Sequence, residues 1–283
     1  GVYITFRLLD FADLTVDGSI ATGAAVSVML IRAGVSPIAT LPIAFLAGAL
    51  AGMVTGLLNT ALGIPGILAS ILTQISLYSI NLNIMGKANQ PVSVDNYPLV
   101  VSLRYVTDGS VSRLLFFLGM IVFLLALIAV MYWYFGTEQG HAIRATGCNG
   151  NMARAQGINT NFIKVLALMI SNGLVGLCGA LYGQFQGASD VNMGRGAIVI
   201  GLAAVIIGEV LFGKFASKRK LAFAFTLASV ILGAVIYYMV YQFVLWLKMP
   251  SEDMKLFSAI VVAIFLAIPY LKEKRTLRKG ASK

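Results

Sequence analysis

Runs of about 20 apolar residues recur along this chain, with short polar segments between them. A helix needs a run of this length to cross a hydrocarbon core of roughly 30 Å. Hydrophobic residues make up 59% of the sequence and charged residues only 11%. Soluble domains normally carry about 25% charged residues. The sequence therefore predicts an all-α polytopic membrane protein.

The apolar runs predict about eight or nine membrane helices, with interrupted or re-entrant segments among them. They cover residues 18–33, 40–58, 66–85, 113–135, 163–184, 196–213, 221–247 and 256–271. No long linker or change of composition divides residues 1–283, so one transmembrane domain is expected. The opening "GVYITFRLL" is similar to the second half of a membrane helix, so a truncated first helix is also expected.

The net charge of +10 is concentrated at the predicted ends of helices. The tail 272–283 and the segment 214–220 are basic, which marks the cytoplasmic face of the membrane. Counting back from them places 136–162 in the cytoplasm, and "QGASDVNMGRG" (186–196) either outside or dipping into the membrane. A nucleic-acid surface would need a folded basic domain, so membrane lipid rather than nucleic acid is the expected partner.

The sequence offers little for catalysis or metal binding. It has one histidine, His141, so metal clusters and Ser–His pairs are poorly supplied. The two cysteines, Cys148 and Cys178, are expected to be free thiols. "GEVLFGKF" imitates a phosphate-binding loop, but Phe215 replaces the hydroxyl residue that would bind Mg²⁺. We therefore predict no catalytic residue, no metal or cofactor bound by this chain, and no ATPase site of its own.

Glycines recur at helical spacing in two of the apolar runs. Small residues four apart let helix backbones approach closely in lipid. Close packing within the chain is the first interpretation, and a subunit interface is the alternative. The glycines are Gly48, Gly52 and Gly56, and then Gly179, Gly183 and Gly187.

The segment "RATGCNGNMARAQGINT" (144–160) is polar and rich in small residues, yet it lies between two apolar stretches. "NMARAQ" predicts a short helix, with Asn149 or Asn151 as its N-cap and Gly157 at its end. A helix of roughly six residues is not stable alone in water, so it must dock on something. A cytoplasmic partner is one interpretation, and an ordinary re-entry loop is the other.

This segment resembles the coupling-helix region of ABC importer permeases of the ribose and branched-chain amino-acid group, R-A-x-G-x-N-x-x-x-A-x-x-x-G-I-N. The stretch "LLDFADLTVDGSIATGAAV" (8–26) is similar to the D-L-[ST]-V-x-x-[GS] region of that group. "DLTVDGS", with 67–89, resembles an uncharacterised permease subfamily whose binding proteins are linked to aromatic amino acids. Cys148 departs from the pattern, because relatives often carry Glu or another polar residue there. The matching positions are Arg144, Ala145, Gly147, Asn149, Ala153, Gly157, Ile158 and Asn159.

The resemblance implies a type II ABC importer fold and a set of partners. Two permease subunits, identical or related, would form the path, and an external binding protein would deliver the solute. Two ATPase subunits, which carry ATP and Mg²⁺, would grip 138–158. Small residues would seat the short helix in a cleft, and arginines would pair with acidic groups there. The implied coupling residues are Arg144, Ala145, Gly147, Asn149, Ala153, Arg154 and Gly157.

Polar side chains at membrane depth are the candidates for the solute path, because burying them in lipid is costly. Gln74, Tyr78 and Asn81 have the spacing of one helical face, whereas Asn83 does not. For every group, hydrogen bonding between helices or interfacial solvation is an equal alternative. The other candidates are Asp13 and Asp17, four residues apart, and Gln184, Gln186, Asp190 and Asn192, near the outer end of 163–184.

The sequence and the resemblance together favour the permease subunit of an ATP-driven importer for a small solute. An amino acid is the favoured solute, and aromatic amino acids are included in that class. A self-sufficient secondary carrier or channel is the first alternative. It would need ion-coupling carboxylates, for which Glu209, Asp13 and Asp17 are the only suggestive residues. An intramembrane enzyme is disfavoured, because no acid–base group of residues is evident.

Overall fold

A computed structural model describes residues 1–93, 97, 99–102, 110–216 and 222–246, and positions 256, 260, 263 and 267. The chain forms two compact units, Gly1–Ile198 and a second that begins at Val199. The predicted helix 256–271 is described only at the four isolated positions, and the tail 272–283 lies outside the described residues.

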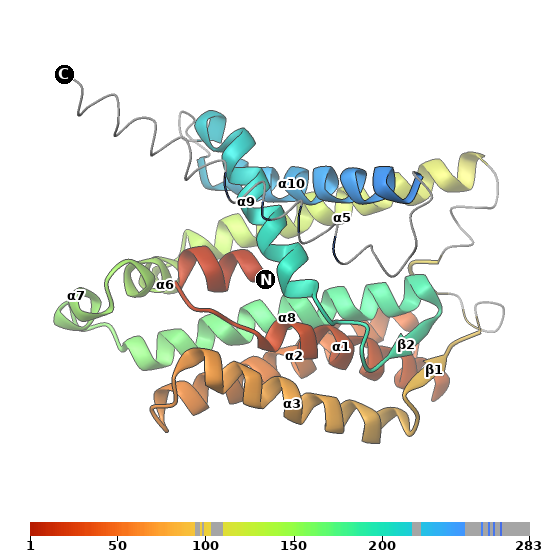
Figure 1. The fold of residues 1–283 in the computed structure, drawn as a ribbon, viewed down its shortest axis with the longest axis horizontal. Helices are drawn as coiled ribbons and strands as arrows, with labels where there is room; N and C mark the ends of the chain where they lie inside the picture. Colours follow the sequence, from red (N-terminus) through yellow and green to blue (C-terminus); the bar gives the residue numbers. More distant parts are fainter. Residues whose placement is uncertain are drawn as a thin grey trace. The chain divides into compact units, whose positions relative to one another are not determined.

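The described elements are almost all helices, and they match the predicted segments within a few residues (Figure 1). The first unit holds η1 (Ile4–Leu8), α1 (Thr15–Arg32), α2 (Pro37–Thr60), α3 (Gly66–Met85), β1 (Asn89–Pro91), α5 (Ser110–Phe135), α6 (Glu138–Cys148), α7 (Gly150–Ala155), α8 (Thr160–Gln186) and β2 (Ala188–Asp190). α9 (Ala197–Ala216) begins at the end of this unit, and α10 (Ala222–Trp246) follows it in the second.

Five helices of the described residues are long and apolar enough to cross a membrane. They are Pro37–Thr60, Gly66–Met85, Arg113–Phe135, Thr160–Gln186 and Ala222–Phe243, and Ala197–Phe212 is a shorter apolar helix. The chain is therefore a polytopic helical membrane protein. A total of eight or nine membrane helices stays a prediction.

α1 is a central helix of the first unit, although it is not among the five candidate spans. It packs against α2, α3 and α8, which Figure 1 shows around it. Most of its residues are buried, and many of them are Gly, Ala, Ser or Thr. A helix surrounded by other helices needs small side chains rather than a lipid-facing apolar surface, which explains its lower hydropathy.

The glycine pattern serves packing within the chain. A Cβ at Gly48 or Gly52 of α2 would collide with the α8 backbone, at Asn172 and Leu168 respectively. Gly179 on α8 lies in the same way against the backbone of Ile20 in α1. These glycines therefore bring α1, α2 and α8 into backbone contact, which confirms the first interpretation.

The structure adds a small sheet that the all-α prediction lacked. β1 and β2 pair antiparallel, with Asn89 opposite Asp190 and Pro91 opposite Ala188. Strands of three residues are too short to show a period-2 pattern in the sequence. The sheet ties the segment after α3 to the segment after α8 at one end of the first unit (Figure 1).

A break in the helical backbone separates η1 from α1. Residues 9–14 are not helical, and Asp10 has a φ of 53°. This non-helical stretch overlaps the start of "DLTVDGS" (13–19), in a region whose path the sequence did not predict. In the second unit, Ala203 and Ile207 of α9 pack with Tyr237 of α10.

Candidate functional site

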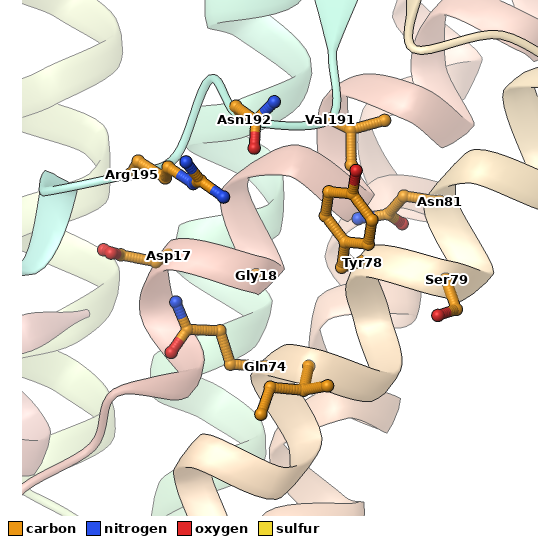
Figure 2. A pocket seen from close by; sticks show the side chains of 10 residues that line it. Asp17, Gly18, Gln74, Tyr78, Ser79, Asn81, Val191, Asn192 and Arg195 are labelled. Atoms are coloured by element: carbon orange, nitrogen blue, oxygen red, sulfur yellow. The ribbon is translucent and has the colours of Figure 1, made fainter.

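One cavity of about 310 Å³ collects polar side chains from three separate parts of the first unit. Figure 2 shows α3 side chains facing the loop after β2, with the start of α1 beside them. The lining residues are Asp17, Gly18, Gln74, Ile75, Tyr78, Ser79, Asn81, Val191, Asn192 and Arg195. Five of the nine predicted path residues are among them: Asp17, Gln74, Tyr78, Asn81 and Asn192.

The polar face predicted on the third apolar segment is present on α3. Gln74, Tyr78 and Asn81 all line the cavity. Asn83 does not line it, and its Nδ2 donates a hydrogen bond of 3.0 Å to the Ser79 carbonyl. Residues three and four apart share a helix face, which is why this prediction from spacing was confirmed.

Asn81 is the buried polar residue of the cavity. Its side chain is fully buried, and neither Oδ1 nor Nδ2 has a hydrogen-bond partner among the described residues. Buried amides are normally paired, and an unpaired buried polar group costs about 1–3 kcal/mol. The amide of Asn81 therefore leaves a donor and an acceptor unused at the cavity wall.

Asp17 lines the cavity, but its carboxylate is hydrogen-bonded to the backbone at the start of α9. Its Oδ2 accepts a hydrogen bond from the Gly196 N–H at 3.0 Å, and its Oδ1 accepts one from the Ile198 N–H at 2.9 Å. A carboxylate at a helix N-terminus satisfies unpaired N–H groups and is favoured by the helix dipole. The negative charge of Asp17 is thus largely compensated by backbone.

Arg195 is the charged cavity residue that the sequence predictions missed. Figure 2 shows its guanidinium extending from the loop after β2 toward the cavity. Within the described part of the chain, this guanidinium has no hydrogen-bond or ion-pair partner. An arginine in a loop predicted to be external goes against the positive-inside distribution, and that departure could have singled it out.

Asp13 lies outside this cavity, in a buried network. Its Oδ2 accepts a hydrogen bond of 2.7 Å from Asn172 Nδ2, and its Oδ1 accepts one of 3.0 Å from the Thr15 N–H. Asn172 Oδ1 in turn accepts a hydrogen bond of 2.7 Å from Ser19 Oγ. Here the alternative of hydrogen bonding between helices fits the geometry, because the network joins the start of α1 to α8.

Gln184 also belongs to a buried network. Its Nε2 donates to Ser27 Oγ at 3.1 Å and to the Pro37 carbonyl at 3.2 Å, and its Oε1 accepts from the Val100 N–H at 3.1 Å. The side chain therefore ties α1 and α2 to α8 rather than lining the cavity.

Two residues that were predicted together with Gln184, namely Gln186 and Asp190, make different contacts. Gln186 is exposed and donates a hydrogen bond of 2.6 Å to Tyr182 Oη. Asp190 accepts a hydrogen bond of 2.7 Å from the Asn192 N–H, so it shapes the loop after β2. Asn192 alone of that predicted group lines the cavity.

The predicted short helix of the coupling segment is present as α7. Asn149 is its N-cap, and its Oδ1 accepts hydrogen bonds of 3.1 Å from the N–H groups of Asn151 and Met152. Gly157 follows the helix with a φ of 84°, a conformation that glycine adopts without strain. The helix, its cap and its terminating glycine are thus confirmed.

The predicted coupling residues divide into an inner and an outer set. A Cβ at Gly147 would collide with the backbone of Leu8 and Leu9, and Ala153 is 3% exposed. These two small residues therefore seat α6 and α7 on their own chain. Four of the predicted residues are exposed, namely Ala145, Asn149, Arg154 and Gly157, and so are Met152 and Ala155.

The two arginines of the coupling segment also contact their own chain. Arg154 Nε donates a hydrogen bond of 2.8 Å to Thr160 Oγ1 at the start of α8. Arg144 is half-buried, and its guanidinium lies over the Phe135 ring, 5.7 Å from the centroid. α7 is thus held to α8, and α6 to the end of α5.

The coupling segment and the β1–β2 sheet lie at opposite ends of α8. α7 comes just before its first residue, Thr160, and β2 follows its last residue, Gln186. Figure 1 shows α7 and the β1–β2 sheet at the two ends of this helix. A helix of 27 residues spans about 40 Å, the thickness of a bilayer with its headgroups.

Comparison with known proteins agrees with this architecture. Residues 1–269 match the family described as branched-chain amino acid transport system, permease component. The tyrosine transport system permease protein of Clostridioides difficile is 40% identical over 94% of this chain and 85% of its own length. An uncharacterized protein of Rickettsia prowazekii is 31% identical over 94% of this chain and 91% of its own length.

More distant relatives include an autoinducer 2 import system permease protein of Yersinia pseudotuberculosis. It is 28% identical over 83% of this chain and 62% of its own length. No solved structure matches the chain. The family and the apolar helices place the chain in the bacterial inner membrane as a multi-pass protein. The chain belongs to the permease-component family of branched-chain amino acid transport systems, the membrane subunits of ABC transporters.

Proposed function

We propose that this chain is the permease subunit of an ATP-driven importer for an amino acid, with tyrosine and other aromatic amino acids as the favoured solutes. The observation that carries the proposal is an exposed, capped short helix just before α8, together with a separate polar cavity formed by α1, α3 and the loop that follows β2. The 40% identity to a tyrosine transport permease supports the choice of solute.

In this proposal, two ATPase subunits bind the outer surface of α6 and α7, and these subunits hold ATP and Mg²⁺. Met152 supports the docking, because it is 64% exposed on a six-residue helix that needs a surface to pack on. Small neighbours, Ala145 and Ala155, leave room for a close approach.

Internal contacts give the motion of the ATPase a route to the cavity. Gly147 lies on the backbone of Leu8 and Leu9, and Arg154 is bonded to the start of α8. The Asp13–Asn172 hydrogen bond then joins α8 to the segment that leads into α1. α1 lines the cavity through Asp17, so a rigid-body shift of α6 and α7 would act on the cavity wall.

The remaining parts of the proposal concern assembly. An external binding protein delivers the solute to the cavity end, and 138–158 faces the cytoplasm. A second permease subunit, identical or related, completes the path, with the eight or nine helices of a type II importer in each copy. The buried glycines Gly48 and Gly52 are used within the chain, so that interface would lie elsewhere.

A self-sufficient carrier would need a carboxylate free to couple an ion. Asp13 and Asp17, two of the three suggested residues, are engaged by Asn172 and by the start of α9. Their engagement supports the ATP-driven proposal over the carrier.

The coupling proposal is tested by Ala145→Trp and Ala155→Trp, because both positions are exposed on the outer surface. In proteoliposomes with the ATPase and the binding protein, we expect ATP-driven uptake of tyrosine to fall at least about tenfold, a loss of some 1.4 kcal/mol of coupling. Membrane insertion and thermal stability should stay unchanged. Lys87→Trp, exposed near the opposite end of the unit, is the control. Normal uptake in both alanine variants would remove the coupling role of this surface.

A further inference from the structure

We propose that the cavity binds a solute that carries a carboxylate, with Arg195 as the carboxylate-binding residue and Asn81 as the hydrogen-bonding residue in the buried wall. The inference rests on the proposed function and deepens it, since it names the chemistry that distinguishes an amino acid from a neutral sugar. It also assigns a specificity-determining role to two residues of this chain.

Asn81 points to a ligand because its amide is fully buried and unpaired on both atoms. The cavity is the space that it lines, so a bound solute can supply the missing partners. The amide has an acceptor oxygen and a donor NH₂ group, so the complementary solute carries a donor and an acceptor close together. An α-amino acid has that arrangement, with its ammonium group beside its carboxylate.

Arg195 gives the cavity its positive charge. Its guanidinium has no partner among the described residues, and the nearby carboxylate of Asp17 is taken up by two N–H groups at the start of α9. A guanidinium binds a carboxylate through two parallel hydrogen bonds, a geometry that a neutral hydroxyl cannot match. The cavity therefore favours a solute with a carboxylate over a polyol.

The walls and the backbone suit a small amphipathic solute. Ile75, Tyr78 and Val191 supply apolar surface, and the volume of about 310 Å³ is at the lower end of small-molecule sites, about 300–1,000 Å³. The β1–β2 pairing and the Asp17 hydrogen bonds hold the loop that carries Arg195. A loop held in place before the solute arrives lowers the entropy cost of binding.

The test measures binding of radiolabelled solutes to the full chain in lipid nanodiscs. L-tyrosine and tyramine differ only in the carboxylate, so their affinity ratio reports on it. We expect the wild type to prefer L-tyrosine. Arg195→Gln should weaken L-tyrosine binding about 10- to 100-fold, whereas tyramine, a cation without a carboxylate, should bind as tightly as before or more tightly. Lys87→Gln, which removes an exposed positive charge outside the cavity lining, is the matched control.

Asn81→Leu separates binding from folding. Leucine removes the unpaired buried amide, so the variant should unfold at the same temperature as the wild type or higher. It should bind both L-tyrosine and tyramine at least about tenfold more weakly, because each loses hydrogen bonds to the amide. Asn83→Leu, on the same helix but outside the cavity lining, should change neither quantity. A lower unfolding temperature with unchanged binding in Asn81→Leu would show that Asn81 is only structural.

The outcomes distinguish this inference from the proposed function. ATP-driven tyrosine uptake that is unaffected by Arg195→Gln and Asn81→Leu would overturn the site and leave the importer standing. The expected binding pattern in nanodiscs, together with uptake that needs no ATPase, would support the site and overturn the importer. Failure of the wild-type chain to bind L-tyrosine more tightly than tyramine would also overturn the site.

Discussion

Three asparagines of this chain show how position decides what one side chain does. Asn149 caps α7 through its Oδ1, and Asn172 pairs with the buried Asp13. Asn81 is equally buried but has no partner in the described structure. The first two stabilise the fold, whereas the third is a cost to it, and such a cost points to a ligand.

The contrast between Asn172 and Asn81 predicts opposite effects of the same substitution. Asn172→Leu removes the partner of the Asp13 carboxylate and of Ser19 Oγ, so it should lower the free energy of unfolding by about 2–3 kcal/mol. Asn81→Leu should not lower it. Thermal unfolding of both variants in the same detergent makes the comparison. Equal losses in the two would contradict the different roles assigned to these amides.

The glycines offer a second prediction at the residue scale. Gly52→Ala should destabilise the chain by about 1–3 kcal/mol, because the added Cβ meets the Leu168 carbonyl and must push α2 away from α8. Gly119→Ala on α5, where a Cβ has open space, should be neutral or slightly stabilising. The midpoint of thermal unfolding measures both. A stable Gly52→Ala variant would mean that the two helices are not in backbone contact.

At the scale of the element, α7 depends on its cap and on its neighbours. It has only six residues, so its own hydrogen bonds cannot hold it against unfolding in water. Asn149 satisfies two N–H groups at its start, and Arg154 bonds it to Thr160 of α8. Losing the cap therefore releases an element whose shape the proposed coupling needs.

Asn149→Ala should accordingly weaken coupling without unfolding the protein. The loss of an N-cap costs about 1 kcal/mol, enough to shift a six-residue helix toward disorder. We expect lower ATP-driven uptake of tyrosine, with the unfolding temperature of the whole chain little changed. Asn151→Ala is the control, because the cap is the Asn149 side chain and not that of Asn151. Equal uptake in the two variants would count against a role for ordered α7.

At the scale of the whole chain, α8 is long and apolar enough to cross a membrane between the coupling segment and the loop after β2. Cys148 lies just before α7, and Asn192 lies in the loop after β2, and both are exposed. The basic clusters predict that the first faces the cytoplasm.

Cysteine labelling checks this orientation. In a Cys178→Ser background, a membrane-impermeant maleimide should label Cys148 in inside-out vesicles and not in intact spheroplasts. With Cys148 and Cys178 both changed to Ser, the added Asn192→Cys should show the reverse pattern. Labelling of both positions from one side would contradict a membrane-spanning α8.

Local patterns in the sequence were sufficient for the helices and for single faces. Apolar length located the helices, the 3.6-residue period put Gln74, Tyr78 and Asn81 on one face, and capping chemistry located α7. These features depend on residues close together in the chain, so a single sequence contains them.

Only the tertiary structure decided which polar residues share a site. Asp13 and Gln184 are polar, as residues of a solute path are expected to be. They are buried between helices, however, and long-range hydrogen bonds engage them there. Arg195 joined the cavity because the β1–β2 pairing and the Asp17 contacts bring its loop to α3. Gly147 and Ala153 likewise face their own chain rather than a partner. Such placements depend on contacts between residues far apart in sequence, which no local pattern records.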